Sequence, residues 1–351
     1  VTNDAPATYP VGTTTVTWTV TDDAGNNATC EQTVTVIDNE LPTIGCPADI
    51  STTADAGVCF ATGIDLGTPT TSDNCGVQNV SNDAPAQFPV GTTTVTWVVL
   101  DVNGNTASCT QDVTVSDDED PLISCPANIT TDTDAGTCVV TSIALGSPVT
   151  SDNCGIQNIT NNAPASYPVG ITTVTWTVTD LYGNTATCEQ TITVEDNENP
   201  LISCPGDINT DTDLNECFAS GVNLGNPTTS DNCGVQSVVN NAPVTYPVGT
   251  TTVTWTVTDI YGNIATCDQN VTVSHNENPE ITCPANISVS SDPGVCNADV
   301  VVPLPVTSDN CGVQSVVNDY NGTGNASDNY PLGTTTIIWT VTDIYGNINT
   351  C

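Results

Sequence analysis

Hydrophobic and polar residues alternate along a short segment that recurs through the chain. In the stretch TTTVTWTV at residues 13–20, threonine alternates with valine or tryptophan. Period-two alternation of β-branched residues is typical of a half-buried β-strand. A turn with a glycine follows at residues 21–26, TDDAGN, and later copies continue into a second alternating run such as ATCEQTITV at residues 186–194. The pattern predicts a β-hairpin.

Further short strands are predicted earlier in the same unit. The runs CPADISTTAD (46–55) and VCFATGIDL (58–66) flank a turn at Ala56 and Gly57, and GVQNVSN (76–82) gives another strand. No stretch has the period of a helix. About six or seven short strands with frequent turns favour a β-sandwich. Trp97 and its equivalents are predicted to fill the core rather than to stack on a ligand.

The unit is repeated in tandem. The string SDNCG starts at Ser72, Ser151, Ser230 and Ser308, so the copies follow one another at nearly equal intervals. Each unit is large enough for a small domain with its own core. The sequence therefore predicts an all-β tandem array of immunoglobulin-like sandwich domains, arranged end to end as a rod. The predicted repeats are 1–38 (a C-terminal half), 39–117, 118–196, 197–275 and 276–351 (without its last strand).

The chain contains no basic side chain except one histidine. Forty acidic residues against no lysine or arginine give a net charge of −40. Nucleic acid is excluded as a partner, because nothing is present to neutralise phosphates, whereas divalent cations are plausible partners. No membrane-spanning run or signal peptide is visible. Because the sequence starts and stops inside a unit, we expect it to be part of a longer polypeptide.

Seventeen cysteines are present, four in each full unit and one, Cys30, in the first partial unit. A repeating even number in a polar chain predicts disulfides formed in an oxidising compartment. Zinc is the alternative, but the cysteines of a unit are widely spaced, no CxxC motif occurs, and the chain has a single histidine. Four cysteines allow three pairings per unit.

Several sequence blocks occur in a fixed order in each unit: GCPADI, TSDNCG, FPVGTTTVTW and DVNGNTASC, followed by VTV and an acidic junction with a proline. This order resembles the hyalin repeat over nearly the whole chain. The resemblance implies an immunoglobulin-like sandwich module of extracellular proteins, associated with cell adhesion and extracellular matrix. It implies a class of module and no particular activity.

The resemblance also implies a disulfide pattern, since many hyalin repeats keep only the cysteine of the CP block and the one after GN. The implied pairs are Cys46–Cys109, Cys125–Cys188, Cys204–Cys267 and Cys283–Cys351. The remaining cysteines would then pair as Cys59–Cys75, Cys138–Cys154, Cys217–Cys233 and Cys296–Cys311.

Acidic and amide residues gather at each junction between units, before a proline that stiffens the link. They are Asp38, Asn39 and Glu40; Asp117, Asp118, Glu119 and Asp120; Glu195, Asp196, Asn197 and Glu198; and Asn276 and Glu277. Either of two further sets could reach the junction and complete a site. They are the turn residues Asp22, Asp101, Asp180, Asp259 and Asp343, and the SDNC residues Asp73, Asp152, Asp231 and Asp309.

Calcium is the cofactor that this oxygen-rich pattern predicts, because Ca²⁺ takes six to eight hard oxygen ligands. Cadherin linkers are similar, with Asp and Asn before a Pro between tandem sandwiches. The alternative is that the acids are solvated turn residues that form local hydrogen bonds. The fourth junction carries His275 where the others carry more acids, and we expect it to bind more weakly.

Sequons for N-glycosylation occur at eight positions, although chance alone yields many in a chain so rich in Asn and Thr. The positions are Asn27, Asn79, Asn128, Asn158, Asn270, Asn286, Asn321 and Asn325. Glycans attached to the chain, or bound by it, therefore remain among the predicted interactions.

No catalytic constellation is visible, and paired carboxylates that recur in every unit do not suggest an active site, so the sequence predicts a protein that is not an enzyme. The leading hypothesis is a secreted structural component of an extracellular fibre, stalk or matrix that associates with itself into a filament. The alternative is the repeat stalk of a cell-surface adhesin that binds glycans or presents a ligand-binding domain; an accessory stalk of an enzyme is a third possibility. The style of the sequence suggests a bacterial source.

Overall fold

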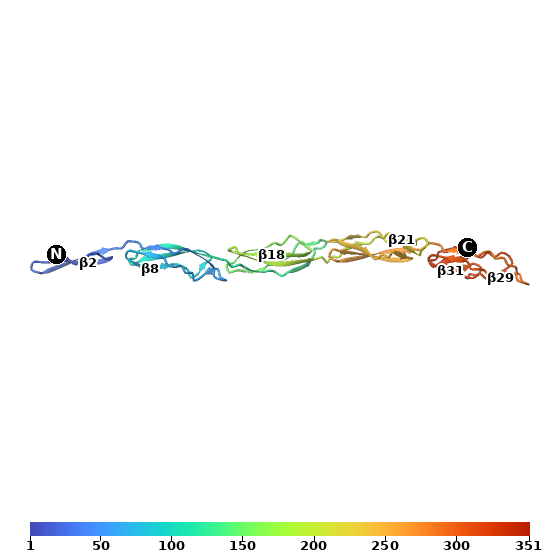
Figure 1. The fold of residues 1–351 in the computed structure, drawn as a ribbon, viewed down its shortest axis with the longest axis horizontal. Helices are drawn as coiled ribbons and strands as arrows, with labels where there is room; N and C mark the ends of the chain where they lie inside the picture. The colour runs from blue at the N-terminus through green and yellow to red at the C-terminus, as the bar shows by residue number, and fades with distance from the viewer. The chain divides into compact units, whose positions relative to one another are not determined.

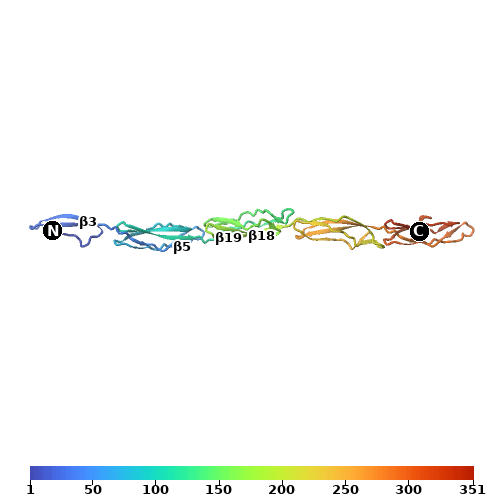
Figure 2. The same cartoon turned by 90° about the horizontal axis from the view of Figure 1, so that it is seen from above.

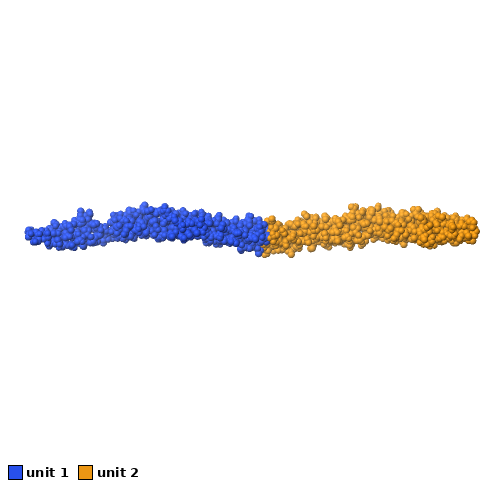
Figure 3. Space-filling model, turned by 90° about the horizontal axis from the view of Figure 1, so that it is seen from below, with its two compact units in different colours: residues 1–129, 144–164, 172–192 blue, residues 130–143, 165–171, 193–351 orange.

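A computed structural model describes all 351 residues as β-strands and loops, without a helix. It therefore contains no helix long and apolar enough to cross a membrane. The chain forms two compact units (Figure 3), and each is described by itself. Unit 1 comprises residues 1–129, 144–164 and 172–192, and unit 2 comprises residues 130–143, 165–171 and 193–351.

Unit 1 begins with a partial repeat of three strands. They are β1 (Thr2–Asn3), β2 (Gly12–Thr21) and β3 (Asn27–Val36), in the order β1-β2-β3. The predicted hairpin is the antiparallel pair β2–β3, whose strands are labelled in Figures 1 and 2. Trp18 of β2 is 36% exposed, and its Nε1 donates to Gln32 Oε1 at 2.9 Å.

The second repeat is complete and lies in unit 1. Its strands are β4 (Thr43–Gly45), β5 (Ile50–Thr53), β6 (Phe60–Ala61), β7 (Thr70–Ser72), β8 (Val77–Asn82), β9 (Phe88–Pro89), β10 (Gly91–Asp101) and β11 (Thr106–Ser116). One layer is a four-stranded sheet in the order β5-β11-β10-β8, and the two-stranded ribbons β4–β7 and β6–β9 face it. The hairpin β10–β11 is antiparallel, whereas β5 pairs with β11 in parallel.

The core of the second repeat follows from the alternation in the sequence. Val95, Trp97 and Val99 of β10 are buried, whereas Thr96 and Val98 between them are half-buried, and Phe88 packs into the same cluster as Trp97. The tryptophan is held by Gln111 of β11, whose Oε1 accepts a bond of 3.1 Å from Trp97 Nε1. The amide of Gln111 donates to the carbonyls of Ala48 and Leu66. This buried glutamine thus links the four-stranded sheet to the two loops that contain Ala48 and Leu66.

The third repeat is divided between the two units. Its strands are β12 (Leu122–Ser124), β13 (Ile129–Asp132), β14 (Val139–Val140), β15 (Val149–Ser151), β16 (Ile156–Asn161), β17 (Tyr167–Pro168), β18 (Gly170–Asp180) and β19 (Thr185–Glu195). The ribbon β12–β15 belongs to unit 1 and the ribbon β14–β17 to unit 2.

The fourth repeat lies in unit 2 and reproduces the second. Its strands are β20 (Leu201–Ser203), β21 (Ile208–Asp211), β22 (Phe218–Ser220), β23 (Thr228–Ser230), β24 (Val235–Asn240), β25 (Thr245–Pro247), β26 (Gly249–Asp259) and β27 (Ile264–Ser274). The sheet order is β21-β27-β26-β24, and Trp255 again donates to a buried glutamine, Gln269.

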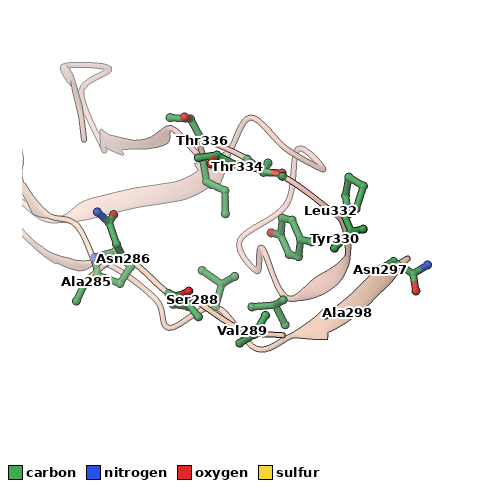
Figure 4. A pocket seen from close by; sticks show the side chains of 18 of the residues that line it. Ala285, Asn286, Ser288, Val289, Asn297, Ala298, Tyr330, Leu332, Thr334 and Thr336 are labelled. Atoms are coloured by element: carbon green, nitrogen blue, oxygen red, sulfur yellow. The ribbon is translucent and has the colours of Figure 1, made fainter. Parts of the chain in front are cut away.

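The last repeat has a smaller sheet. Its strands are β28 (Glu280–Thr282), β29 (Asn297–Val300), β30 (Val306–Ser308), β31 (Val313–Asn318), β32 (Asp328–Pro331), β33 (Trp339–Asp343) and β34 (Ile348–Thr350). A cavity of about 570 Å³ lies beside Trp339, lined by Ile287, Val289, Ala298 and Tyr330 among others (Figure 4).

Candidate cation and cross-link sites at the repeat junctions

Four junctions connect successive repeats, and each is named here after its first residue: Asp38, Asp117, Asp196 and His275. These residues follow the long hairpin of one repeat and stand at the start of the next. Three loops converge on each junction: the linker itself, the SDNC loop and the tight turn of the β-hairpin that follows.

The hairpin turn holds one aspartate in a fixed orientation. Asp259 is fully buried, and its Oδ1 accepts backbone N–H bonds from Tyr261, Gly262 and Asn263 at 2.6–2.8 Å. Its Oδ2 accepts from the side chain of Asn263 at 2.8 Å. Gly262 has φ +97, a conformation that favours glycine. These bonds explain why the sequence D-x-x-G-N recurs at the turn.

The same bonds decide the charge of this carboxylate. Burial alone would raise the pKa of Asp259, but the hydrogen bonds from Asn263, Tyr261 and Gly262 outweigh it and hold the pKa below its usual value. Asp101, Asp180 and Asp343 have lowered pKa values for the same reason. The turn therefore presents an ionised carboxylate to the junction.

The SDNC loop supplies a second aspartate. Asp231 Oδ2 accepts the backbone N–H groups of Cys233 and Gly234, both at 2.8 Å. Its other oxygen, Oδ1, is buried without a partner, and so is Oδ1 of the adjacent Asn232. Asn232 instead uses its Nδ2, which donates to Asp196 Oδ1 and to the Thr137 carbonyl, each at 3.1 Å.

The linker aspartate completes the cluster. Asp196 is 6% exposed, and its Oδ2 is buried without a partner. One oxygen each from Asp196, Asp231 and Asp259 lies within 4.8 Å of the other two. The same arrangement occurs in Asp117, Asp152 and Asp180 and in Asp38, Asp73 and Asp101. Burial, together with the charges of Asp152 and Asp180, raises the pKa of Asp117 against the bond from Asn153.

Such a cluster is chemically incomplete. A buried oxygen without a hydrogen-bond donor costs about 1–3 kcal/mol, and more when charged. Three close carboxylates also repel one another, and the chain has no lysine or arginine to neutralise them. A divalent cation would satisfy both the charge and the unpartnered oxygens, since Ca²⁺ binds carboxylate and amide oxygens with irregular geometry. The donor set therefore fits calcium.

The structure brings together the linker, turn and SDNC aspartates that the sequence singled out, but not the glutamates. Glu119 Oε2 accepts the N–H of Gly57 at 2.8 Å, and Glu198 Oε2 accepts that of Gly136 at 3.0 Å. Gly57 and Gly136 lie in the loop between the second and third strands of the preceding repeat, at residues 54–59 and 133–138, which is here called the tip loop. The predicted ligands that lie outside the three-carboxylate clusters are Asn39, Glu40, Asp118, Glu119, Asp120, Glu195, Asn197, Glu198, Asn276 and Glu277.

The fourth junction has a histidine in place of the linker aspartate. The side chain of His275 is fully buried, with Nε2 at 3.2 Å from Asp343 Oδ2 and 3.7 Å from Asp309 Oδ2. Its Nδ1 lies 3.3 Å from Thr212 Oγ1, and its ring centroid is 5.6 Å from that of Tyr345.

Four disulfides lie within repeats. They are Cys46–Cys109, Cys125–Cys188, Cys204–Cys267 and Cys283–Cys351, with Cα atoms 5.7–5.8 Å apart. Each ties the strand at the start of a repeat to the second arm of its long hairpin, as the sequence resemblance implied.

The other disulfides cross from one repeat to the next. They are Cys59–Cys154, Cys138–Cys233 and Cys217–Cys311, with Cα atoms 4.7–4.9 Å apart. The expected pairs Cys59–Cys75, Cys138–Cys154, Cys217–Cys233 and Cys296–Cys311 are therefore wrong. Cys30, Cys75 and Cys296 are exposed free thiols.

The physical reason for the correction is distance. Cys59 lies in the tip loop, at the end of the sandwich where β10 begins, whereas Cys75 lies beside the turn where β10 ends. The 11 residues of β10 separate these ends by about 33 Å, at roughly 3.3 Å per residue. A disulfide needs Cα atoms within about 7 Å. A tip-loop cysteine can thus reach only the SDNC loop of the next repeat.

The predicted glycosylation positions are mostly accessible. Asn270 is half-buried and the other seven sequon asparagines are exposed. Asn270 Oδ1 accepts a bond from Thr252, and Asn128 Oδ1 accepts the N–H of Thr191.

Comparison with known proteins identifies the repeats. The HYR domain model matches residues 1–36, 37–115, 116–194, 195–273 and 275–351, which is almost the whole chain. The chain belongs to the HYR domain family. Its HYR repeats are 32% identical to Hyalin of Strongylocentrotus purpuratus over 332 residues, which cover 89% of this chain and 27% of that protein. They are also 32% identical to Hyalin of Lytechinus variegatus over 330 residues, which cover 88% of this chain and 62% of that protein.

Other relatives and solved structures are more distant from these HYR repeats. A sushi, von Willebrand factor type A, EGF and pentraxin domain-containing protein of Rattus norvegicus is 31% identical over 177 residues, covering 47% of this chain and 5% of that one. The protocadherin γB4 extracellular domain covers 97% of this chain and 71% of its own at 13% identity and a TM-score of 0.32. Drosophila N-cadherin EC1-4 covers 87% and 97% at 10% identity and a TM-score of 0.28.

The family and the bonds place the chain among extracellular adhesion and matrix repeat proteins. Seven disulfides are typical of secreted or cell-surface proteins. The relatives named here are animal proteins, so the expected bacterial source has no support from them.

Proposed function

We propose that the chain is a structural component of an extracellular fibre, stalk or matrix, in which successive HYR repeats are joined by disulfides and by Ca²⁺ and the chains associate into a filament. The observation that carries this proposal is the cross-repeat disulfide between Cys138 and Cys233 beside the Asp196 cluster. A covalent bond of this kind restricts the movement of one repeat against the next. Repetition of the same bond at successive junctions suits a load-bearing or spacing role.

Calcium is assigned to the three clusters that retain a linker aspartate. At the Asp196 junction, the oxygens free to bind are Asp196 Oδ2, Asp231 Oδ1 and Asn232 Oδ1, and Asp259 contributes from the hairpin turn. The bound ion would link the linker, the SDNC loop and the hairpin turn. In this proposal the folding units are residues 39–117, 118–196 and 197–275, between a partial unit at 1–38 and a last unit at 276–351.

The principal test compares thermal unfolding with and without calcium. We expect Ca²⁺ in large excess to raise the unfolding temperature relative to excess EGTA, because an ion that binds only the folded state stabilises it. Small-angle X-ray scattering should then show a narrower distribution of the maximum dimension of the chain in Ca²⁺ than in EGTA. Reduction with a thiol should lower the unfolding temperature further. Unfolding that is insensitive to calcium, with the disulfides intact, would rule out the metal part of the proposal.

A second candidate function is the stalk of a cell-surface adhesin. The relative from Rattus norvegicus carries other domain types in its name, which favours HYR repeats that present another domain. Exposed sequon asparagines would suit a glycosylated stalk. A glycan array separates the two functions, since binding of a defined sugar by this segment alone would favour the adhesin.

A further inference from the structure

The linker residue that differs among the four junctions is His275. Asp38, Asp117 and Asp196 recur at one constant interval, and the next step of the same length arrives at His275. We infer that the His275 junction binds no Ca²⁺, because the imidazole takes the place that the ion holds at the other three junctions. This inference rests on the proposed calcium sites.

The backbone of this junction is held as in the others. Asn347 Nδ2 donates to the His275 carbonyl at 3.0 Å, and Asn263 Nδ2 donates to the Asp196 carbonyl at 2.9 Å. The tip loop is also attached in the same way, by Cys217–Cys311 here and by Cys138–Cys233 there. The two junctions therefore share the backbone frame around the linker residue, although Ser274 replaces Glu195 and Asn310 Nδ2 donates to Glu277 where Asn232 donates to Asp196.

The imidazole stands between the two carboxylates that remain. Nε2 lies 3.2 Å from Asp343 Oδ2 and 3.7 Å from Asp309 Oδ2, with a full hydrogen bond to neither. If Nδ1 accepts the hydroxyl proton of Thr212 at 3.3 Å, Nε2 carries a proton that points toward both oxygens. The partial positive charge of this N–H group then faces the two carboxylates, in the position proposed for Ca²⁺ at the other three junctions.

A calcium ion cannot share this position. It would need to lie within about 2.3–2.6 Å of each carboxylate oxygen, and the Nε2 proton already occupies the space between them. The cluster has also lost one of its three carboxylates. Cys311 offers no thiolate as a replacement, because it is bonded to Cys217. Full burial of the ring and its contact with Tyr345 hold it there.

The test is to count bound ions by native mass spectrometry of the intact, oxidised chain in calcium solutions of increasing concentration. We expect three Ca²⁺ in the wild type, four in His275→Asp and two in Asp196→His. His275→Phe keeps an aromatic ring in this place without adding an oxygen ligand and should keep three, which makes it the matched control. Near-ultraviolet circular dichroism checks that each variant retains the packing of its tryptophans.

The possible outcomes separate the inference from the proposed function. Four ions in the wild type, or three in His275→Asp, would overturn the inference and leave the calcium sites in place. No ion in any form would overturn both. Zn²⁺ bound stoichiometrically by the wild type and not by His275→Phe would also overturn the inference, because the imidazole would then be a ligand and not a substitute for the ion.

Hydrogen exchange of the wild type gives an independent measure that needs no variant. Addition of Ca²⁺ should slow exchange of the Cys233 and Gly234 amides of the Asp196 junction at least about tenfold relative to EGTA. The Cys311 and Gly312 amides of the His275 junction should change less than about twofold. Equal slowing at both loops would contradict the inference.

Discussion

The Asp38 and Asp117 junctions share a linker, an SDNC and a turn aspartate but differ in their hydrogen bonds and in two linker residues, which are Asn39 and Leu41 in one and Asp118 and Asp120 in the other. At the Asp117 junction the tip loop of the preceding repeat is present, and Cys59 is bonded to Cys154. Asn153 Nδ2 reaches the Val58 carbonyl at 3.2 Å. At the Asp38 junction Cys75, the counterpart of Cys154, is an exposed thiol.

The hydrogen bonds rearrange accordingly. At the Asp38 junction, Asn74 Nδ2 donates to Glu40 Oε2 at 2.9 Å, and Asp38 Oδ2 accepts from Asn103. At the Asp117 junction, Glu119, the counterpart of Glu40, accepts the Gly57 N–H of the tip loop instead. Asp117 Oδ2 is left buried without a partner. The tip loop of the preceding repeat thus takes part in the Asp117 junction, where its Gly57 N–H donates to Glu119 and its Val58 carbonyl accepts from Asn153.

The largest expected effect comes from breaking the cross-repeat disulfide at the Asp117 junction. Cys59→Ser with Cys154→Ser opens a loop with a sequence separation of 95 residues, which corresponds to roughly 4–5 kcal/mol in the chain-entropy model. Differential scanning calorimetry should show a repeat that unfolds at a lower temperature. The control is Cys75→Ser, an exposed thiol at the equivalent position, which should change stability by less than about 0.5 kcal/mol. Equal effects of the two changes would contradict the difference between the junctions.

The next prediction concerns calcium affinity at the same two junctions. Because Asp117 is buried and Asp38 only half-buried, an ion in the Asp117 cluster should bind roughly tenfold more tightly than one in the Asp38 cluster, which corresponds to about 1.4 kcal/mol. Isothermal titration calorimetry of Asp152→Asn should show loss of a tight site, and Asp73→Asn loss of a weak one. Loss of sites with equal affinity would show that the burial of the linker aspartate does not affect the ion.

A smaller effect is expected from the glutamates that change partners. Glu119→Gln weakens the acceptor for the Gly57 N–H and should cost less than about 1 kcal/mol, because this exposed bond is well hydrated. Thermal unfolding at low and high salt would measure it. Glu40→Gln is the matched control, since Glu40 bonds only within its own junction. A larger loss of stability in Glu40→Gln than in Glu119→Gln would contradict the role assigned to the bond between Glu119 and the tip loop.

The smallest effect is a dependence on pH in excess EGTA. Burial raises the folded-state pKa of Asp117 above its ordinary value of 3.8, so the folded state binds a proton more readily than the unfolded chain does. Stability from this group is therefore present at low pH and lost as the pH rises through the raised pKa. Asp117→Asn should raise the unfolding temperature near neutral pH without Ca²⁺ and lower it with Ca²⁺.

The dependence of stability on pH that arises from Asp180 has the opposite sign. Hydrogen bonds from Asn184 and the turn hold its pKa below 3.8 despite burial, so its contribution is present above pH 3.8 and is lost as the pH falls through the lowered value. Unfolding temperatures for Asp180→Asn and Asp117→Asn, measured from acidic to neutral pH, should diverge. Parallel profiles would contradict the different environments assigned to the two carboxylates.

Local patterns in the sequence were sufficient for the fold of one repeat. Alternation at residues 91–101 predicted the strand β10 and placed Trp97 in the core, because side-chain direction along a strand depends only on position. The role of Gln111 was not predicted, although a glutamine recurs two residues after each hairpin cysteine outside the last repeat.

The residues of the candidate site could be predicted from the sequence, but their contacts and the pairing of the cross-repeat disulfides could not. The amino-acid pattern alone established the array of repeats, the count of cysteines and the aspartates of the linker, turn and SDNC loop. The packing of one repeat on the next settled three other features: that Cys59 bonds to Cys154, that three aspartates meet while the neighbouring glutamates reach the tip loop, and that His275 lies between Asp309 and Asp343. The physical reason is that strand alternation is set by adjacent residues, whereas these contacts depend on which end of a sandwich about 33 Å long meets its neighbour.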